Sequence, residues 1–467
     1  MKKYSKLHFW ITVFYFTLYL IVGGSLLIKQ PFGNPPDEYN RYLIPQYIAE
    51  HGTLPNGYEE SIRINGYGFS YGFQPILPYM LQGYAMRFTS LFTDDETALL
   101  YTARSVNLFL GLLTAWFVLR LAGKWFPEKR LGWFFSFLAT FLPQSIFVHT
   151  YVNTDSCCIL SIAIMLYGLT LGLRDNFSGR SSVIMAIGII LCALSYYNAY
   201  GYILSCILLF TVSFLSFSSQ KPHFHWNAFL RKGLFISAIV LLGISWWFIR
   251  SAILYDGDFL GLKARNECAV LYASPKYHPD TRVTWQSQGF SLWDMLFDSD
   301  FWMLSSLSFI GIYGAMSIIT SIWVYRFYKT ILFCGVLFCL ALPLSATTET
   351  KSSGLSKGRR GLRIFYHLNM VFCMIMPFAL SLYYSYTVDY QPQGRYLLPA
   401  LLPLCYYTTR GLEKFFSLQA VPFFKKDRKK RILTGSIAVL CAIIVGSLLL
   451  TVYGYAFPYY EANPVAP

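Results

Sequence analysis

The stretch that decides the fold is NPPDEYNRYLIPQYIAEHG, residues 34–52, which follows an apolar segment at residues 8–28 almost at once. It opens with two prolines and the adjacent carboxylates Asp37 and Glu38, in a chain of 467 residues of which only 13% are charged. Soluble globular proteins contain about 25% charged residues. Apolar segments recur along this chain, and about 20 such residues cross ~30 Å of hydrocarbon as a helix. The sequence therefore predicts an all-α integral membrane protein with ionisable groups just beyond its first span.

The apolar segments predict a bundle of eleven or twelve transmembrane helices, and we expect the whole chain, 1–467, to form a single integral-membrane domain. Basic residues gather in the short connectors, which is typical of the cytoplasmic side of a membrane protein. The net charge of +15 is explained by this topology, so no nucleic-acid partner is expected. The predicted spans are 8–28, 98–122, 131–150, 156–173, 182–197, 200–217, 233–251, 304–325, 330–346, 364–386, 396–411 and 432–456.

Two long loops fall on the outer side of the membrane under this topology, residues 29–97 and 252–303. Within the first loop, residues 34–52 and 76–92 predict amphipathic helices that lie on the outer membrane surface. Asn34 is expected to cap the first of these helices, and Gly52 to end it. The ten cysteines show no spacing typical of a disulfide framework or a zinc site, so no metal site and no cofactor are predicted, although a divalent ion stays open.

Near the end of the chain, the alternation of spans across the membrane and the distribution of basic residues predict different topologies. Strict alternation puts the basic stretches 347–363 and 425–431 outside, which the positive-inside rule disfavours. If residues 330–346 form a hairpin or a partly immersed segment, 347–363 returns to the cytoplasm and 412–431 becomes a basic cytoplasmic loop. We therefore expect eleven full spans and one irregular segment.

Asp37 and Glu38 are the first candidates for catalysis. A helix N-terminus stabilises carboxylates, so simple capping is one explanation, and Arg41 lies four residues beyond Asp37, where it could pair with it. Ionisable groups at membrane depth that line a cavity are more often functional. Adjacent helical residues point about 100° apart, so one carboxylate would act as the base and the other would support it.

A second polar group is VNTDS, residues 152–156, between two predicted spans. Asp155 falls at the same outer face as Asp37, and it is either a helix N-cap or a further site carboxylate. His149 precedes it by about two turns. A histidine there is more often a buried interfacial residue, but a contact with a bound acceptor is the functional alternative.

The third group is DYQPQGRYLLPALLP, residues 389–403, which opens a late span. Arg395 presents a planar fork suited to phosphate, and Gln393 and Tyr396 flank it. These three residues are predicted to bind a lipid phosphate. The alternative is an arginine that merely reaches lipid head groups.

Arg104 lies well inside the second predicted span, where an unpaired charge is costly. It is a candidate for the same phosphate site. The alternative is a structural salt bridge, with Asp37, Glu38 or Asp155 as the partner.

Taken in order, these motifs resemble a bacterial family of predicted membrane proteins whose architecture is similar to the GT-C superfamily of integral-membrane glycosyltransferases. The resemblance covers residues 8–411. The chain departs from the pattern at Asn40, where a histidine is expected, and at residues 196–198, where relatives often have a basic residue. The motifs that carry it are PPDE (35–38), FQPILPY (73–79), an arginine early in span two, PQ (143–144) with NTD (153–155), FW (301–302) and QGRYLLP (393–399).

The resemblance implies an inverting glycosyltransferase in the bacterial plasma membrane, with its active site on the extracytoplasmic side. Its partners would be a polyprenyl-phosphate sugar donor, membrane lipid, and a cell-envelope glycan or glycolipid acceptor. It assigns Asp37 as the general base or acceptor-orienting group. It assigns Arg395 to the growing charge on the leaving phosphate. The expected acceptor contacts, on weaker grounds, are Arg41, His149, Arg265 and Arg282.

Three alternatives stay open at this point: a transporter or flippase for a lipid-linked saccharide, a glycan polymerase or ligase of the same fold, and a noncatalytic scaffold. Transporters place their binding groups near the bilayer midplane, often on broken helices within inverted repeats. Here the acidic residues cluster in the outer loops, and the sequence shows no clear internal repeat.

Overall fold

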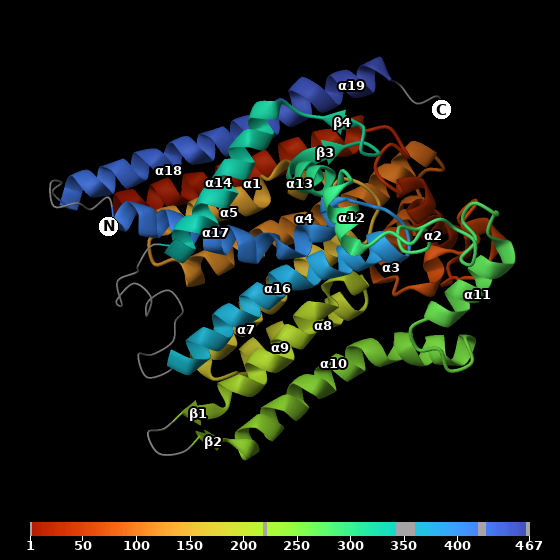
Figure 1. Cartoon of the computed structure of the whole chain (residues 1–467), viewed down its shortest axis with the longest axis horizontal. Helices are drawn as coiled ribbons and strands as arrows, with labels where there is room; N and C mark the ends of the chain where they lie inside the picture. Colours follow the sequence, from red (N-terminus) through yellow and green to blue (C-terminus); the bar gives the residue numbers. More distant parts are fainter. Residues whose placement is uncertain (1, 218–221, 342–359, 419–425, 464–467) are drawn as a thin grey trace.

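The computed structural model describes residues 2–217, 222–341, 360–418 and 426–463. Long helices run side by side to form a bundle, with the N-terminus and a short β-hairpin at its left end in Figure 1. The opposite end carries the helices of the two predicted outer loops, and we call it the loop end. The first part of the chain contains α1 (Lys2–Lys29), α2 (Glu38–His51), η1 (Glu60–Ile62), η2 (Tyr71–Phe73), α3 (Leu77–Thr89), α4 (Glu96–Trp125), α5 (Lys129–Thr140), α6 (Pro143–Phe147), α7 (Asp155–Asp175) and α8 (Gly179–Ala193).

The rest of the described chain completes the bundle and returns to the loop end after α10, after α16 and after α18. The hairpin at the left end pairs Leu215 with Phe224 in antiparallel register. The remaining elements are η3 (Tyr197–Ala199), α9 (Tyr200–Ser213), β1 (Leu215–Phe217), β2 (Pro222–Phe224), α10 (Trp226–Leu254), α11 (Leu262–Tyr272), α12 (Leu292–Phe297), α13 (Phe301–Gly311), β3 (Ile312–Tyr313), β4 (Ile318–Ile319), α14 (Ile322–Ala341), α16 (Arg360–Thr387), η4 (Gly394–Ala400), α17 (Leu401–Leu418), α18 (Lys426–Leu449), a π-helical turn (Leu450–Ala456) and α19 (Phe457–Ala462).

Seven helices of the described part are long and apolar enough to cross a membrane: α1, α4, α7, α10, α14, α16 and the continuous segment Arg431–Ala462. The shorter α5, α8, α9 and α17 pack against them within the bundle. This architecture confirms the predicted all-α membrane fold.

The predicted span 304–325 is wrong. Helix α13 ends at Gly311, whose Cα lies so close to Pro143 that an added Cβ would come within 2.8 Å of its side chain. The chain then turns through the β3–β4 hairpin, with Gly314 at φ +61°. Since residues 322–341 form one continuous helix, a hairpin at 330–346 is wrong over its described part, whereas the other form of this prediction, a partly immersed segment, stays a prediction. Residues 342–346 lie outside the described residues.

The two surface helices of the first loop are confirmed as α2 and α3, with one correction. Asn34 does not cap α2, because the helix begins at Glu38 after Asp37 turns the chain in a left-handed conformation (φ 62°). Gly52 ends the helix as predicted, with φ 70° and its N–H donating to the Ile48 carbonyl at 2.9 Å.

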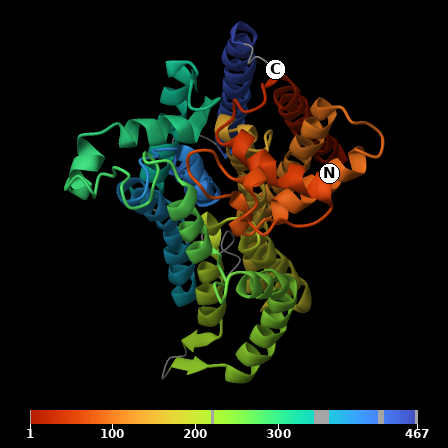
Figure 2. The ribbon, with the colours of Figure 1, turned by 90° about the vertical axis from the view of Figure 1, so that its right-hand side faces the viewer.

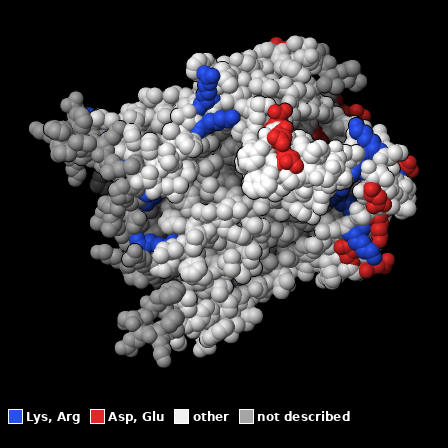
Figure 3. Space-filling model, viewed as in Figure 1, with Lys and Arg blue, Asp and Glu red and all other residues white. Residues whose placement is uncertain are grey.

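The two loops pack against each other at the loop end, where Figure 2 shows the orange segments of the first loop beside the green segments of the second. The Ser274 N–H donates to the Gly66 carbonyl at 2.9 Å. The rings of Tyr67 and Tyr277 stack with centroids 4.3 Å apart. The acidic side chains visible in Figure 3 also lie toward this end of the molecule.

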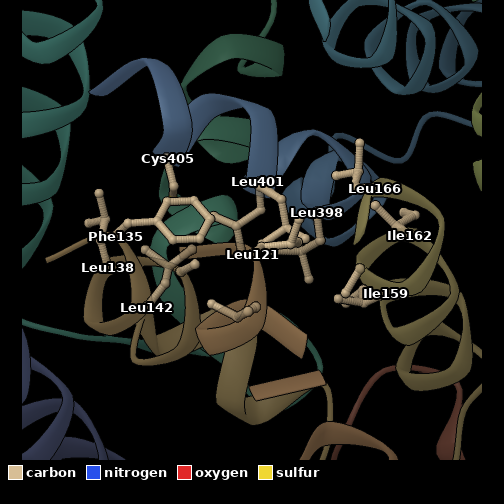
Figure 4. Close-up of a cluster of buried hydrophobic side chains, with 14 of the residues drawn as sticks. Leu121, Phe135, Leu138, Leu142, Ile159, Ile162, Leu166, Leu398, Leu401 and Cys405 are labelled. Carbon is tan, nitrogen blue, oxygen red and sulfur yellow. The ribbon is translucent and has the colours of Figure 1, made fainter. Parts of the chain in front are cut away.

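The hydrophobic core lies between α4, α5 and α7 on one side and η4 with α17 on the other, and Figure 4 shows part of it. Leu398 and Leu401 are each 2% exposed, so η4 and the start of α17 are held against the core. This packing fixes the motif that follows Gln393. The labelled side chains are Leu121, Phe135, Leu138, Leu142, Ile159, Ile162, Leu166, Leu398, Leu401 and Cys405.

Candidate active site

Asp37 lies between two arginines at the start of α2. Its carboxylate forms a close ion pair with Arg395, and its Oδ2 lies 3.9 Å from Nη2 of Arg41. Burial alone would raise the pKa of Asp37, but the two guanidiniums more than reverse this and hold the pKa below its ordinary value. The side chain is still 36% exposed. Asp37 is therefore an ionised carboxylate that faces open space.

Arg395 approaches Asp37 from η4, which is 358 residues away in the sequence. Its Nη1 donates to the Pro36 carbonyl at 3.3 Å, and its Nη2 donates to the Tyr396 hydroxyl at 3.0 Å. Tyr396 in turn donates to Oε1 of Gln391 at 2.7 Å. The Arg395 guanidinium is thus fixed by the chain around it, and it is almost fully buried.

Gly394 permits this arrangement. A Cβ at this position would lie 2.0 Å from the backbone nitrogen of Phe309 on α13, and its own N–H donates to Oγ of Ser308 at 2.6 Å. Only glycine allows so close an approach of two backbones. Gln393 precedes it, and its buried Oε1 has no hydrogen-bond partner in the described chain.

Arg41 connects Asp37 to the segment before α7. Its Nη1 donates to the Tyr79 hydroxyl at 3.2 Å and to Oγ1 of Thr154 at 3.1 Å. Its guanidinium lies 4.8 Å from the centre of the Tyr71 ring. Asp155 is buried close enough to interact electrostatically with Arg41, but no N–H of the described residues donates to its Oδ2.

Glu38 and Arg104 form a separate, fully buried pair. Nε of Arg104 donates to Oε1 of Glu38 at 2.8 Å, and Nη2 donates to Oε2 at 2.6 Å. The backbone N–H of Val152 donates to the same carboxylate at 3.1 Å, and Arg104 also donates to the carbonyls of Leu27 and Gln30, both at 2.9 Å. Both side chains are 0% exposed. The structural salt bridge considered for Arg104 is thus present, and this geometry assigns neither residue to substrate.

Asp37 opens onto a cavity of about 340 Å³, which we call the polar cavity. Among the residues weighed from the sequence, Arg41, Arg265, Arg282 and Tyr396 also line it. The residues that do not line it are Glu38, Arg104, Asp155, Gln393, Arg395 and the buried His149. His149 packs beside Gly111 of α4 instead. The other lining residues are Asn40, Ile64, Tyr67, Phe69, Tyr71, Gln74, Tyr196, Tyr197, Asn198, Leu380, Ser381, Tyr383, Tyr384 and Gln391.

An apolar groove of about 930 Å³ lies between α13, α14, α16 and the η4–α17 segment. It reaches the polar cavity's wall, because Leu397 lines the groove while its neighbour Tyr396 lines the cavity. On α16, Phe378 lines the groove, and Leu380 lines the cavity. We call this shared wall the seam. It consists of η4 and of the part of α16 that contains Phe378 and Leu380. Lys329 is the charged residue among those that line the groove.

Sequence reasoning missed the aromatic wall of the polar cavity. Tyr67 and Tyr71 come from the first loop and Tyr384 from α16. A tyrosine-rich stretch at 58–79 was the available signal for the first two. The two departures from the family pattern, Asn40 and residues 196–198, also line this cavity. Within the described ranges, no group of three or more His, Cys, Asp or Glu side chains is arranged to hold a metal ion.

Comparison with solved structures gives the class of fold. The archaeal oligosaccharyltransferase AglB from Archaeoglobus fulgidus, solved with an inhibitory peptide and a dolichol-phosphate, aligns with a TM-score of 0.52 at 15% identity, over 97% of this chain and 56% of that one. ArnT from Cupriavidus metallidurans, solved with undecaprenyl phosphate, aligns with a TM-score of 0.52 at 13% identity, over 95% and 74%. The chain spans little more than half the length of AglB. At these identities the alignments show the fold alone, which is a GT-C-like bundle similar to those of AglB and ArnT.

The sequence itself gives the family. Residues 45–404 match the family described as "Predicted membrane protein (DUF2142)", and the chain belongs to this family. A search of curated protein sequences gave no match.

Proposed function

We propose that this protein is an inverting glycosyltransferase that moves a sugar from a polyprenyl-phosphate carrier to a cell-envelope glycan or glycolipid at the outer face of a bacterial plasma membrane. One observation carries the proposal. An ionised carboxylate, Asp37, faces a polar cavity whose wall, at Tyr396 and Leu397, is shared with an apolar groove. A reaction between a lipid-borne donor and a polar acceptor needs these two environments side by side.

The donor's two parts match the two environments. Its isoprenoid chain would lie in the apolar groove between α13, α14 and α16. Its phosphate would lie near the Tyr396 hydroxyl, which accepts a hydrogen bond from Arg395. The lipid phosphates bound to the two structural relatives support a carrier of this class.

Asp37 acts on the acceptor in this proposal. Its carboxylate accepts a hydrogen bond from the acceptor hydroxyl and takes the proton as the hydroxyl oxygen attacks the anomeric carbon. The bond from that carbon to the phosphate oxygen breaks, and negative charge grows on the leaving phosphate. In this proposal Arg41, which lines the cavity, and Arg395, which lies buried behind Asp37 and the Tyr396 hydroxyl, stabilise that charge. Both guanidiniums are already held by hydrogen bonds, so they do not need to reorganise. A single direct displacement inverts the anomeric centre.

The distribution of charge supports the outer-face location. The loop end carries α2 and α11, and the turns and helix starts at the opposite end carry basic residues, including Lys129 and Arg130 at the start of α5 and Arg180 at the start of α8. The positive-inside rule places those turns and helix starts in the cytoplasm. The polar cavity then opens to the extracytoplasmic side.

The transporter alternative loses one of its two supports. An intramembrane Arg104 and the many aromatic residues would suit a translocation path. Arg104 is instead bound by Glu38 and by three backbone carbonyls, those of Leu27, Gln30 and Pro31, and its side chain has no exposed surface.

A transfer assay in membranes tests the proposal, with a panel of polyprenyl-phosphate sugars and cell-envelope acceptors. We expect Asp37→Asn to lose at least about 100-fold in transfer rate, because the amide cannot accept the proton. The matched control is Asp280→Asn, an exposed acid of the second loop that does not line the polar cavity, and it should keep wild-type activity. Full activity of a normally expressed Asp37→Asn variant would reject Asp37 as the base.

A further inference from the structure

Two arginines of the second loop face the polar cavity without a compensating charge. Arg265 of α11 and Arg282 both line it, and neither side chain forms an ion pair or a hydrogen bond among the described residues. Arg265 instead lies over the ring of Phe69, with its guanidinium carbon 4.0 Å from the centroid. Both are half-buried. Guanidinium groups held in such a position bind carboxylate and phosphate oxygens through paired hydrogen bonds.

The charge in the cavity is not balanced by its own acids. Among the described residues that line it, Asp37 is the acid, and its charge is already matched by Arg395 and Arg41.

Nearby carboxylates are also engaged elsewhere. Asp389 accepts a hydrogen bond from Gln391 at 2.6 Å. Asp258 accepts from the backbone N–H of Lys263 at 2.7 Å and of Ala264 at 3.1 Å, and Glu267 lies 3.7 Å from Lys263. Among the described residues, none of these carboxylates forms an ion pair with Arg265 or Arg282.

We propose that Arg265 and Arg282 form a second anion subsite, distinct from the Asp37–Arg395 pair, that binds an additional negatively charged group of a substrate. The group is a phosphate or a carboxylate, carried either by the lipid carrier as a diphosphate or by an acidic saccharide. This inference rests on the proposed function, which positions the substrates in the cavity. It adds that one of these substrates carries a second negatively charged group. Tyr67 and Tyr384 stand in the same wall and can donate hydroxyl hydrogen bonds to the anion.

Binding measurements on the purified full-length protein in detergent test the subsite without requiring transfer. Two matched probe pairs are used: farnesyl diphosphate against farnesyl monophosphate, and a glucuronate-containing disaccharide against its neutral glucose analogue. Wild type is compared with Arg282→Gln and with the double variant Arg265→Gln/Arg282→Gln. The control is Arg326→Gln, because Arg326 also lies over an aromatic ring, Trp323, but outside the cavity.

We expect wild type and the control to bind the more anionic member of at least one pair tenfold or more tightly than its partner. The double variant should lose that preference. A preference within the farnesyl pair identifies a diphosphate carrier, and one within the disaccharide pair identifies an acidic saccharide. Absence of any preference in wild type, or a preference that survives the double variant, would overturn the inference.

Arg282→Gln keeps the test decisive if the double variant does not fold, because the Arg282 side chain forms no hydrogen bond with the described residues. The Arg282→Gln variant should bind the preferred probe severalfold more weakly than wild type does. Charge-selective binding without sugar transfer would contradict only the proposed function. Normal sugar transfer by a protein that binds both members of each probe pair equally well would contradict only the subsite.

Discussion

Asp37 adopts a left-handed backbone conformation, which costs about 1–2 kcal/mol for most residues with a side chain and is tolerated best by Asn and Asp. This conformation turns the carboxylate away from the N-terminus of α2 and toward Arg395, and the side chain makes no capping hydrogen bond. The residue thus gives up the ordinary stabilising role of an acid at a helix start.

The pH dependence of transfer should report the Arg395 contact. Burial favours the neutral form of Asp37, but Arg395 and Arg41 lower its pKa, so wild type should keep activity until the pH falls below the ordinary carboxyl range. In the Arg395→Gln variant one of the two positive charges that lower the pKa of Asp37 is lost, while burial still raises this pKa. The acid limb of the pH profile of kcat/KM should therefore move to higher pH. Residual activity measured across pH checks this, with Arg326→Gln as the control. An unmoved limb would show that Arg395 does not set the ionisation of Asp37.

The residues at the start of α2 predict Asp37 and Glu38 only as a pair, one acting as the base and the other supporting it, and the family resemblance assigns the base to Asp37. The structure separates their surroundings: Glu38 is fully buried and accepts from the Val152 N–H, whereas Asp37 lines the polar cavity. Arg104 was weighed with three partners, and two hydrogen bonds to the Glu38 carboxylate identify Glu38 as the partner. These contacts join distant segments, so local sequence patterns cannot predict them.

At the scale of elements, η4 depends on α13. Gly394→Ala should displace η4, because the new methyl carbon would lie 2.0 Å from the Phe309 nitrogen, which is backbone and cannot move as a flexible side chain does. We expect a loss of transfer of tenfold or more and a lower melting temperature. Gly446→Ala in α18 is the control, since nothing lies within 4 Å of its Cβ position. Equal behaviour of the two variants in the melting and transfer assays would contradict this packing.

Elements with a strong apolar signal were predicted well, and irregular ones were not. Spans such as α4, α7 and α10 follow directly from runs of apolar residues. The run at 304–325 is just as apolar, but Gly311 and Gly314 let it close against Pro143 and turn back. Hydropathy cannot detect such a turn, because it depends on contacts with another part of the chain.

At the scale of the whole molecule, the topology can be tested by cysteine labelling in intact cells. Glu60→Cys at the loop end should react with a membrane-impermeant maleimide, whereas Arg180→Cys should react only after the membrane is opened. Both positions are exposed, so accessibility depends on the side of the membrane alone. The protein with its native cysteines gives the background signal. Labelling of position 180 in intact cells would reverse the orientation of the polar cavity.

Composition predicts that the chain is a membrane bundle, but it cannot predict the cavities. The walls of the polar cavity come from the first loop, residues 196–198, the second loop and the α16–η4 segment, so that residues as far apart in the sequence as Asp37 and Tyr396 line it together. Arg265 and Arg282 had only a weak assignment from the sequence, because no local motif marks them. Their position depends on the packing of the two loops against each other, for example on the hydrogen bond from the Ser274 N–H to the Gly66 carbonyl.

The seam has a practical consequence for altering selectivity. Tyr396 and Leu397 are consecutive residues, one of which lines the polar cavity and the other the apolar groove. Under the proposed function, the sites for the isoprenoid tail and for the polar part of the substrates are therefore separated by a single peptide unit. A change of size at position 397 would then alter the preferred tail length, and variants of Arg282 would alter the preferred charge of the substrate without changing the tail.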